Sequence, residues 1–527
     1  MFIKILLLVG FFAVMVIVGI LARRKATDVN GFVLGGRSVG PWLTAFAYGT
    51  SYFSAVVFVG YAGQFGWKYG LSSTWVGIGN AVIGSLLAWV LMGRRTRVMT
   101  HHLDARTMPE FFGKRYDSKS LRIVASVIVF VFLIPYTASV YSGLSKLFGQ
   151  AFNIEYKWCV IFMAALTALY VILGGYMATV MNDFIQGIIM LFGICAVITA
   201  VLRGKGGFLS AVQQLSQIPA DPASTTPALL EMKGPFVSFF GPDPLNLLGV
   251  IVLTSLGTWG LPQMVQKFYA IKSEKAVKTG TVVSTIFAIV ISCGCYFLGG
   301  FGRLFDNPSI HGEGGKILYD GIVPSMLSTL PDILIGVVIV LVLSASMSTL
   351  SSLVLTSSST FTIDFLKTSV FKKMSDKVQL LVMRLLIVFF ISVSVILALN
   401  PPTFIAQLMG ISWGALAGAF LAPFLYGLFM KKVSKSAVWV SFVYGVGLTV
   451  VNMLLPKFGL PPLFKSPINC GAMAMIGSLI LVPLVSLVTP KMDKEKVEKI
   501  FECYNEEVKV PKKMYLKEDD GEPEEGF

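Results

Sequence analysis

Residues 333–361 read ILIGVVIVLVLSASMSTLSSLVLTSSSTF, an apolar run without a single charged side chain. A helix of about 20 mostly apolar residues is enough to cross the hydrocarbon core of a bilayer. The C-terminal half of the run is nevertheless rich in hydroxyls, where leucine or isoleucine would cost less to bury. On a helix Ser348 and Ser352 share one face, and Ala345 and Thr349 also align. The run therefore predicts a membrane-spanning helix with a polar face inside the bilayer.

The hydroxyl cluster in this run has two interpretations. Na+ is a hard cation that prefers oxygen ligands, and clustered hydroxyls facing an unwound helix can replace much of its water. Alternatively, each hydroxyl donates back to the carbonyl one turn earlier, which satisfies isolated serines well. Back-bonding does not explain so many hydroxyls on one stretch, and we therefore favour an ion site. The later run 357–360 fits back-bonding or the lining of a cavity.

The composition places the rest of the chain in a membrane as well. Of the 527 residues 55% are hydrophobic and 13% are charged, and 20 of the 71 charged residues fall in the last 37 positions. Soluble proteins carry about 25% charged residues, so the body cannot cover a soluble surface. We expect a membrane domain over residues 1–490, in the plasma membrane, followed by a charged cytoplasmic tail over 491–527.

Several classes of protein are excluded by the distribution of polar residues. The net charge of +15 forms no continuous basic patch, because the basic residues lie at the ends of apolar runs. That pattern matches the charge bias of membrane loops rather than a nucleic-acid binder. No span contains a His/Asp or Cys/His pair of the kind that catalysis requires. We expect neither an enzyme nor a cofactor.

Thirteen stretches are candidate membrane spans. They lie approximately at 2–22, 41–65, 71–92, 121–147, 158–173, 184–201, 247–268, 279–298, 333–361, 378–399, 404–429, 438–455 and 473–488. The Lys and Arg residues around them divide 23 to 11 between the two sets of alternating loops, with Lys267 counted in the richer set. Because cytoplasmic loops carry the excess, the N-terminus is predicted outside and the C-terminus inside.

Two spans carry residues that disturb a helix. The second span contains the small and hydroxylated stretch 47–55, and the seventh contains Gly257, Gly260 and Pro262. Proline removes a backbone donor, and glycine lowers the cost of leaving helical geometry. A tight helix crossing would also use small residues. Interrupted spans in two corresponding places, however, are the usual pointer to a transporter's binding site.

Asp183 opens the sixth candidate span just inside its apolar boundary. A carboxylate inside a membrane is costly and is by default a functional candidate. An aspartate at the start of a helix also serves as an N-cap, because it accepts backbone N–H groups. The residue alone leaves both interpretations open.

Taken together, these segments resemble the sodium:solute symporter family. The resemblance covers residue 32 to about residue 432. It rests on Leu34-Gly35-Gly36-Arg37-Ser38, on Gly174-Gly175 with Asp183 and Gln186, and on Met347-Ser348-Thr349-Leu350-Ser351. It implies an all-α polytopic membrane protein with a five-plus-five inverted-repeat fold like that of leucine transporters. The two repeats would cover about 41–201 and 247–430.

The resemblance also implies ligands for sodium. In the family, the principal site uses carbonyls of the broken second span together with a carbonyl and hydroxyls of the ninth. The matching positions here are Thr50, Phe53, Ala345, Ser348 and Thr349. Some relatives hold a second sodium ion, for which the matching positions are Asp183, Ser348, Ser351 and Ser352. The resemblance thus favours Asp183 as a ligand, and Na+ is the only metal expected.

The family's substrate-binding positions match this sequence less completely than its sodium-binding positions do. The candidates are Tyr52, Tyr136, Thr254, Thr258, Trp259 and Pro262. Proline symporters resemble this chain at Tyr136, but they carry an aspartate where Tyr52 stands, and tryptophan and tyrosine where Thr254 and Thr258 stand. The stretches 178–183 and 260–262, with Tyr52, look more like the pantothenate branch.

The sequence therefore predicts a secondary active transporter that takes up a small organic solute with Na+ by alternating access. The expected solute bears a carboxylate: pantothenate, proline, another amino acid or a monocarboxylate. The alternatives are a channel that conducts a cation or a solute, and a proton-coupled carrier on the same fold. A channel needs a continuous lined pore, to which helices broken at mid-depth are less suited.

Overall fold

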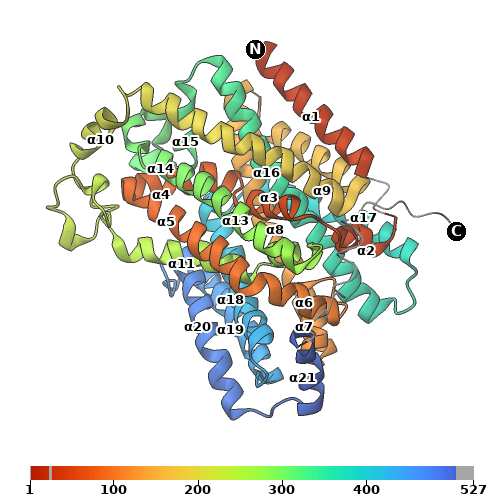
Figure 1. The fold of residues 1–527 in the computed structure, drawn as a ribbon. Coiled ribbons are helices and arrows are strands. Elements are labelled where there is room, and N and C mark those ends of the chain that lie inside the picture. The colour runs from red at the N-terminus through yellow and green to blue at the C-terminus, as the bar shows by residue number, and fades with distance from the viewer. Residues whose placement is uncertain (1, 23–26, 153, 506–527) are drawn as a thin grey trace, which may run out of the picture.

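The computed structural model describes residues 2–22, 27–152 and 154–505, and every regular element in these ranges is a helix (Figure 1). The predicted all-helical membrane fold is confirmed. The acidic end of the tail, from Glu518 to Glu525, lies outside the described residues.

The first half of the core corresponds to the predicted second to sixth spans. Its elements are α3 (Pro41–Tyr52), the π-helical η3 (Val56–Tyr61), α4 (Ala62–Tyr69), α5 (Thr74–Gly79), the π-helical η5 (Asn80–Leu87) and η6 (Trp89–Gly93), α6 (Arg94–His102), α7 (Met108–Arg115), α8 (Lys119–Phe152) and α9 (Tyr156–Arg203). The first span of this half, which is the second predicted span of the chain, is interrupted between α3 and η3, within the stretch 47–55.

The second half corresponds to the predicted seventh to eleventh spans. Its elements are α11 (Pro244–Gly260), α12 (Pro262–Ala270), α13 (Glu274–Ala288), the π-helical η9 (Ile289–Cys293), α14 (Gly294–Gly299), α15 (Ile322–Ser328), α16 (Asp332–Thr360), the π-helical η14 (Phe361–Val370), α17 (Asp376–Leu399) and α18 (Ile405–Phe429). Its first span is broken between α11 and α12, which are bent by 45°.

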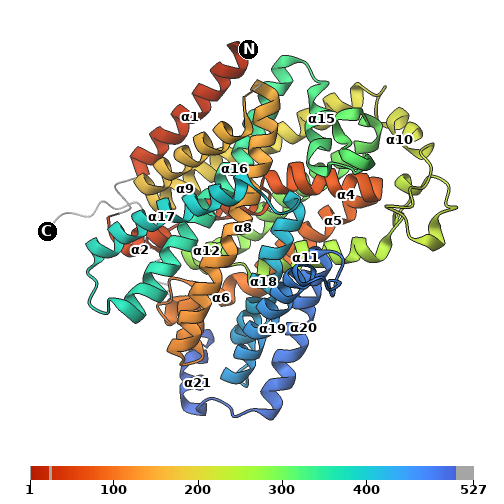
Figure 2. The same ribbon diagram turned by 180° about the vertical axis from the view of Figure 1, so that it is seen from behind.

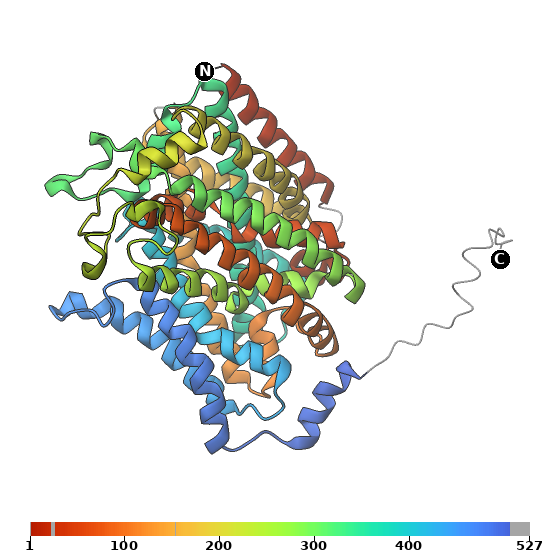
Figure 3. The same ribbon diagram turned by 60° about the vertical axis from the view of Figure 1, so that its left-hand side comes forward.

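Six further helices surround this core: α1 (Phe2–Ala22), α2 (Val29–Leu34), α10 (Phe208–Ser216), α19 (Lys435–Leu454), α20 (Pro467–Val488) and α21 (Lys494–Phe501). α1 packs along α9, and α18 packs against α19 and α20. In Figure 3 the blue helices α19, α20 and α21 gather at one end of the molecule. Short 3-10 turns join the remaining elements.

The long helices explain how the predicted spans relate to the structure. Nine helices of the described residues are long and apolar enough to cross a membrane, and the bent pair α11–α12 adds a tenth span. Two of the nine are unusually long. Val56–His102, the continuous run from η3 to α6, has 47 residues, and Tyr156–Arg203, which is α9, has 48. At about 1.5 Å per residue, each is roughly twice as long as the hydrocarbon core is thick.

Each of these two long helices contains a glycine with a positive φ angle. Gly70 has φ 61°, and Gly175 has φ 55° inside α9. Glycine is the default residue where φ is positive, so both positions divide a double-length helix into two spans. Together with α1, this division agrees with thirteen spans. The span count and the orientation of the termini remain predictions.

In the middle of the fold α16 packs against both α8 and α9 (Figures 1 and 2). α3 packs against α9, α12, α13 and α16. The two interrupted spans and the hydroxyl-rich helix are therefore brought together in the interior of the fold.

Candidate functional site

The site begins where α3 stops. Phe53 leaves helical geometry with φ −105° and ψ 87°, and its N–H donates the last bond of the helix, to Gly49 O. Ser54 then starts the next segment, because its hydroxyl accepts the N–H of Val56 at 3.2 Å. A carbonyl at the end of a helix has no partner within the helix. The carbonyl of Thr50 is therefore free to face α16.

Two hydroxyls of α16 meet this carbonyl. Ser348 Oγ lies 3.1 Å from Thr50 O, and Thr349 Oγ1 lies 3.3 Å from the same atom. The two hydroxyls are also 3.2 Å and 3.1 Å from Ala345 O. The hydroxyl of Thr50 points elsewhere and donates to Phe46 O. All of these residues are buried, so four oxygen atoms from α3 and α16 meet in one buried place.

The spacing of these oxygens suits a sodium ion. Na+ is close in size to Ca2+, which takes oxygen ligands at about 2.3–2.6 Å. Adjacent ligands of an octahedron with bonds of about 2.4 Å lie about 3.4 Å apart. The observed separations are 3.1–3.3 Å. Each hydroxyl has one hydrogen and can donate to only one of the two carbonyls at a time, whereas a cation between the oxygens would be attracted to all four.

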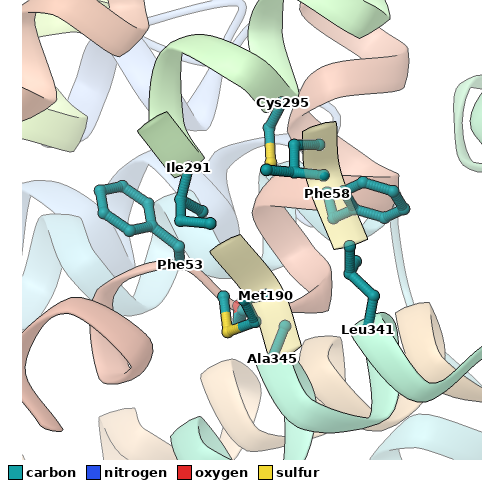
Figure 4. Close-up of a pocket in the computed structure, with 9 residues that line it drawn as sticks. Phe53, Phe58, Met190, Ile291, Cys295, Leu341 and Ala345 are labelled. Carbon is teal, nitrogen blue, oxygen red and sulfur yellow. The ribbon is translucent and has the colours of Figure 1, made fainter. Parts of the chain in front are cut away.

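Phe53 is the fifth residue predicted for the principal sodium site. Phe53 and Ala345 line a small, largely apolar cavity together with Ser54, Met190 and Leu341. In Figure 4 the labelled side chains of this cavity come from the broken second span, α9, α14 with η9, and α16. The structure thus brings all five predicted residues to the junction of α3 and α16.

The residues predicted for a second sodium ion lie one turn further along α16. Ser352 Oγ lies 2.9 Å from Ser51 Oγ and accepts a hydrogen bond from Lys267 Nζ at 3.0 Å. Asp183 Oδ2 lies 3.8 Å from the same ammonium. Ser351 donates within its own helix, to Ser348 O at 2.9 Å. The structure therefore groups Ser352 and Asp183 around a lysine.

The alternative interpretation of Asp183 as an N-cap and the expected placement of Lys267 in a loop are both wrong. Asp183 does not cap a helix: it lies eight positions beyond the break at Gly175, inside α9, and among the described residues its carboxylate accepts no hydrogen bond. Lys267 does not belong to a cytoplasmic loop: it is 1% exposed on α12. The run that precedes Lys267 is apolar enough to carry it into the fold, and the bounds of the seventh predicted span already include it.

The predicted solute residues gather around Gly84 on η5. Tyr52 Oη donates to Thr254 O at 2.6 Å, and Thr258 Oγ1 donates to Gly84 O at 3.1 Å. A Cβ atom at Gly84 would lie 2.2 Å from Tyr52 Oη. Trp259 donates to the neighbouring Ile83 O at 3.0 Å. Four of the six predicted residues therefore lie together where α3, η5 and α11 meet: Tyr52, Thr254, Thr258 and Trp259.

The remaining two solute candidates lie further out. Tyr136 on α8 meets Tyr52 through Trp413 of α18, with ring centroids 5.9 Å and 6.2 Å from that tryptophan. Pro262 starts α12 just past the break. Sequence analysis missed Trp413 and Gly84, since an aromatic residue or a glycine inside an apolar span carries no distinguishing signal.

A charged cluster lies around η14, the segment that directly follows α16 toward the predicted cytoplasmic side. Arg122 Nε lies 2.6 Å from Asp364 Oδ1, and its NH2 group lies 3.2 Å from Glu110 Oε1. Burial disfavours the charge of Glu110, but Arg122 and Lys114 outweigh burial and hold the pKa of Glu110 below its usual range. The cluster ties α7 and α8 to η14.

The fold and the site together define a class: an all-helical membrane protein whose broken spans and hydroxyl-rich helix enclose a buried cluster of hydroxyl and carbonyl oxygens. The model of the sodium:solute symporter family matches residues 32–445. The chain belongs to the sodium:solute symporter family. It is an integral membrane transporter that uses Na+ as its coupling ion, and it is not an enzyme.

Individual relatives agree with this assignment. The chain is 28% identical over 456 residues to the osmoregulated proline transporter OpuE of Bacillus subtilis, covering 86% of this chain and 89% of the relative. It is 30% identical over 499 residues to a sodium/proline symporter of Staphylococcus aureus, covering 92% of each. A Na+-coupled sialic acid symporter in a substrate-bound outward-open state superimposes with TM-score 0.72 at 18% identity, covering 94% of this chain and 99% of that one. That likeness supports the leucine-transporter-type fold.

Proposed function

We propose that this chain takes up a small organic solute bearing a carboxylate, by symport with Na+ and by alternating access. The observation that carries the proposal is the meeting of the Ser348 and Thr349 hydroxyls with the Thr50 carbonyl. It supplies a buried set of oxygens from two helices, one of which is broken at that point. A hard cation is the ligand that such oxygens suit.

Sodium bound at this junction would change how the two helices interact. Without the ion, two hydroxyl hydrogens hold the oxygens of α3 and α16 together. With it, the carbonyls of Thr50 and Ala345 point at a positive charge, and the hydroxyl hydrogens are free to turn away. The ion would therefore order the interrupted end of α3. That end carries Tyr52, which connects the ion site to the solute candidates.

The solute site proposed here is the cluster of Tyr52, Thr254, Thr258 and Trp259 around Gly84. The hydroxyls of Tyr52 and Thr258 and the indole of Trp259 donate to backbone carbonyls of α11 and η5 across the contact, and Thr254 supplies the carbonyl that accepts from Tyr52. A solute entering between α3, η5 and α11 would take over some of these donors, as a carboxylate acceptor can. Proline is the first solute to test, because relatives 28–30% identical are named as proline transporters. Pantothenate is the second.

The energy source sets the direction of transport. One charge crossing 100 mV yields about 2.3 kcal/mol, to which the sodium gradient adds. Coupling is reciprocal: if Na+ raises the affinity for the solute, the solute raises the affinity for Na+ by the same factor.

Thermal unfolding of the purified protein tests the proposal. A ligand that binds only the folded state stabilises it according to its concentration and affinity. The panel contains proline, other amino acids, pantothenate, short monocarboxylates and sugars, each in NaCl and in KCl. We expect a carboxylate-bearing solute to raise the melting temperature in NaCl and to have little effect in KCl. A solute that stabilises the protein equally in both salts would contradict sodium coupling, and a response to sugars alone would contradict the solute class.

A further inference from the structure

Lys267 is a charged residue for which the proposed sodium and solute sites have no role. It lies on α12, just beyond the break of the seventh predicted span, and its side chain is 1% exposed. Burying an ammonium group is costly unless it is paired and hydrogen-bonded. The position must therefore supply compensating partners.

Three groups from two other helices provide that compensation. Lys267 Nζ donates to Ser352 Oγ on α16 at 3.0 Å. It lies 3.8 Å from Asp183 Oδ2 on α9 and 5.3 Å from the centre of the Tyr176 ring on the same helix. A carboxylate, a hydroxyl and an aromatic face are the groups that stabilise a buried cation. The ammonium is held as a bound cation would be.

The oxygens of Asp183 and Ser352 that surround the ammonium also belong to the predicted second sodium site. Asp183 and Ser352 are two of its four members, and both carboxylate oxygens of Asp183 are buried without a hydrogen bond from the described residues. Their nearby cation is the ammonium of Lys267. The lysine thus stands where the resemblance places an ion.

The balance of charges around Asp183 disfavours binding of a sodium ion there in addition to the Lys267 ammonium. Asp183 and Lys267 are both 1% exposed, and together they are neutral. Na+ bound to Asp183 and Ser352 would lie within a few ångströms of the ammonium in a buried interior, where like charges repel strongly. One carboxylate neutralises one cation, and the lysine is already present in every molecule.

A short chain of contacts links this lysine to the proposed sodium site. Lys267 Nζ donates to Ser352 Oγ, which lies 2.9 Å from Ser51 Oγ on α3. Ser51 is followed by the interrupted end of α3, and it is preceded by Thr50, whose carbonyl faces Ser348 and Thr349. The ammonium therefore contacts, through one hydroxyl, the segment that the sodium ion would order.

We infer that the ammonium of Lys267 is a built-in occupant of the second cation site, so that the chain binds one sodium ion rather than two. This inference rests on the proposed sodium coupling. It assigns to Asp183 the role of pairing with Lys267, and to Lys267 the role of a tethered cation that joins α12 to α9 and α16.

The test counts radiolabelled Na+ bound at saturation per chain, in purified full-length protein reconstituted in lipid nanodiscs. Wild type is expected to bind one ion. Lys267→Met removes the charge while keeping much of the volume. Asp183 and Ser352 would then be available to a sodium ion from solution, and this variant is expected to bind two ions. The double variant Lys267→Met/Asp183→Asn is expected to return to one. Lys146→Met is the matched control: it removes another paired lysine, whose ammonium lies 2.7 Å from Asp320, and is expected to bind one.

The outcomes separate this inference from the proposed function. Two ions bound to wild type, or one ion bound to folded Lys267→Met, would overturn the inference and leave sodium coupling intact. No saturable Na+ binding by wild type would overturn both. If Lys267→Met does not yield folded protein, the wild-type count still decides, and Lys267→Arg, which keeps the positive charge, is expected to match it.

Discussion

Thr349→Ala removes one oxygen from the proposed sodium site and changes little else. Thr349 Oγ1 lies 3.3 Å from Thr50 O and 3.1 Å from Ala345 O, and the side chain is fully buried. A hydrogen bond to a charged group contributes about 1.5–3 kcal/mol, and we take the loss of one hydroxyl ligand to a cation as similar. Since 1.4 kcal/mol is a factor of ten, the sodium concentration for half-maximal effect should rise roughly 10- to 150-fold.

The assay is uptake of a solute that stabilises the protein, in proteoliposomes, at increasing external Na+ with total salt kept constant by choline. Ser346→Ala is the matched control. It lies on the same helix and is equally buried, but its hydroxyl donates back to Val342 O at 2.6 Å. Its sodium dependence should stay within about twofold of wild type, as its lost bond is local. Thr349→Ser keeps the oxygen and should stay close to wild type. Equal effects of Thr349→Ala and Ser346→Ala would refute the assignment of Thr349 as a ligand.

Two further substitutions test other parts of the account. Gly84→Ala places a Cβ atom 2.2 Å from Tyr52 Oη; overpacking costs about 1–3 kcal/mol, so solute uptake should fall roughly 5- to 150-fold while Na+ binding persists. Gly447→Ala, whose Cβ would meet nothing within 4 Å, should transport normally, and equal uptake by both variants would contradict the placement of the solute site. Arg122→Met leaves the fully buried Asp364 without its 2.6 Å partner. Breaking a buried ion pair from one side costs about 3–5 kcal/mol, so the melting temperature should fall clearly; an unchanged melting temperature would show that the cluster does not stabilise the fold.

Much of the fold follows from local features of the sequence. The apolar run 333–361 coincides with α16 and the first residue of η14, because the bilayer demands a minimum length that composition alone reveals. The break in the seventh predicted span was expected from Gly260 and Pro262, and the helix does stop at Gly260. The hydroxyls at 348 and 349 were expected to face an unwound helix, and they do face Thr50.

The rest depends on contacts between distant segments. Lys267 and Asp183 are 84 positions apart, and only the packing of α12 against the core decides that this lysine is buried rather than exposed in a loop. Asp183 could be read as a helix cap because the start of the helix was placed eight residues late: Gly175, with its positive φ, marks the true break. Tyr52, Gly84 and Thr258 come from three elements, so their meeting point could not be read from any one of them.

The central claim is that oxygens of α3 and α16 bind Na+ and couple its entry to the solute. Solute uptake into proteoliposomes with an inward gradient of Na+, K+ or choline, each with and without a protonophore, tests it most directly. The account predicts accumulation above equilibrium only with Na+, unaffected by the protonophore when the membrane potential is clamped. Equal uptake rates with all three cations, or uptake abolished by collapsing the proton gradient alone, would contradict it.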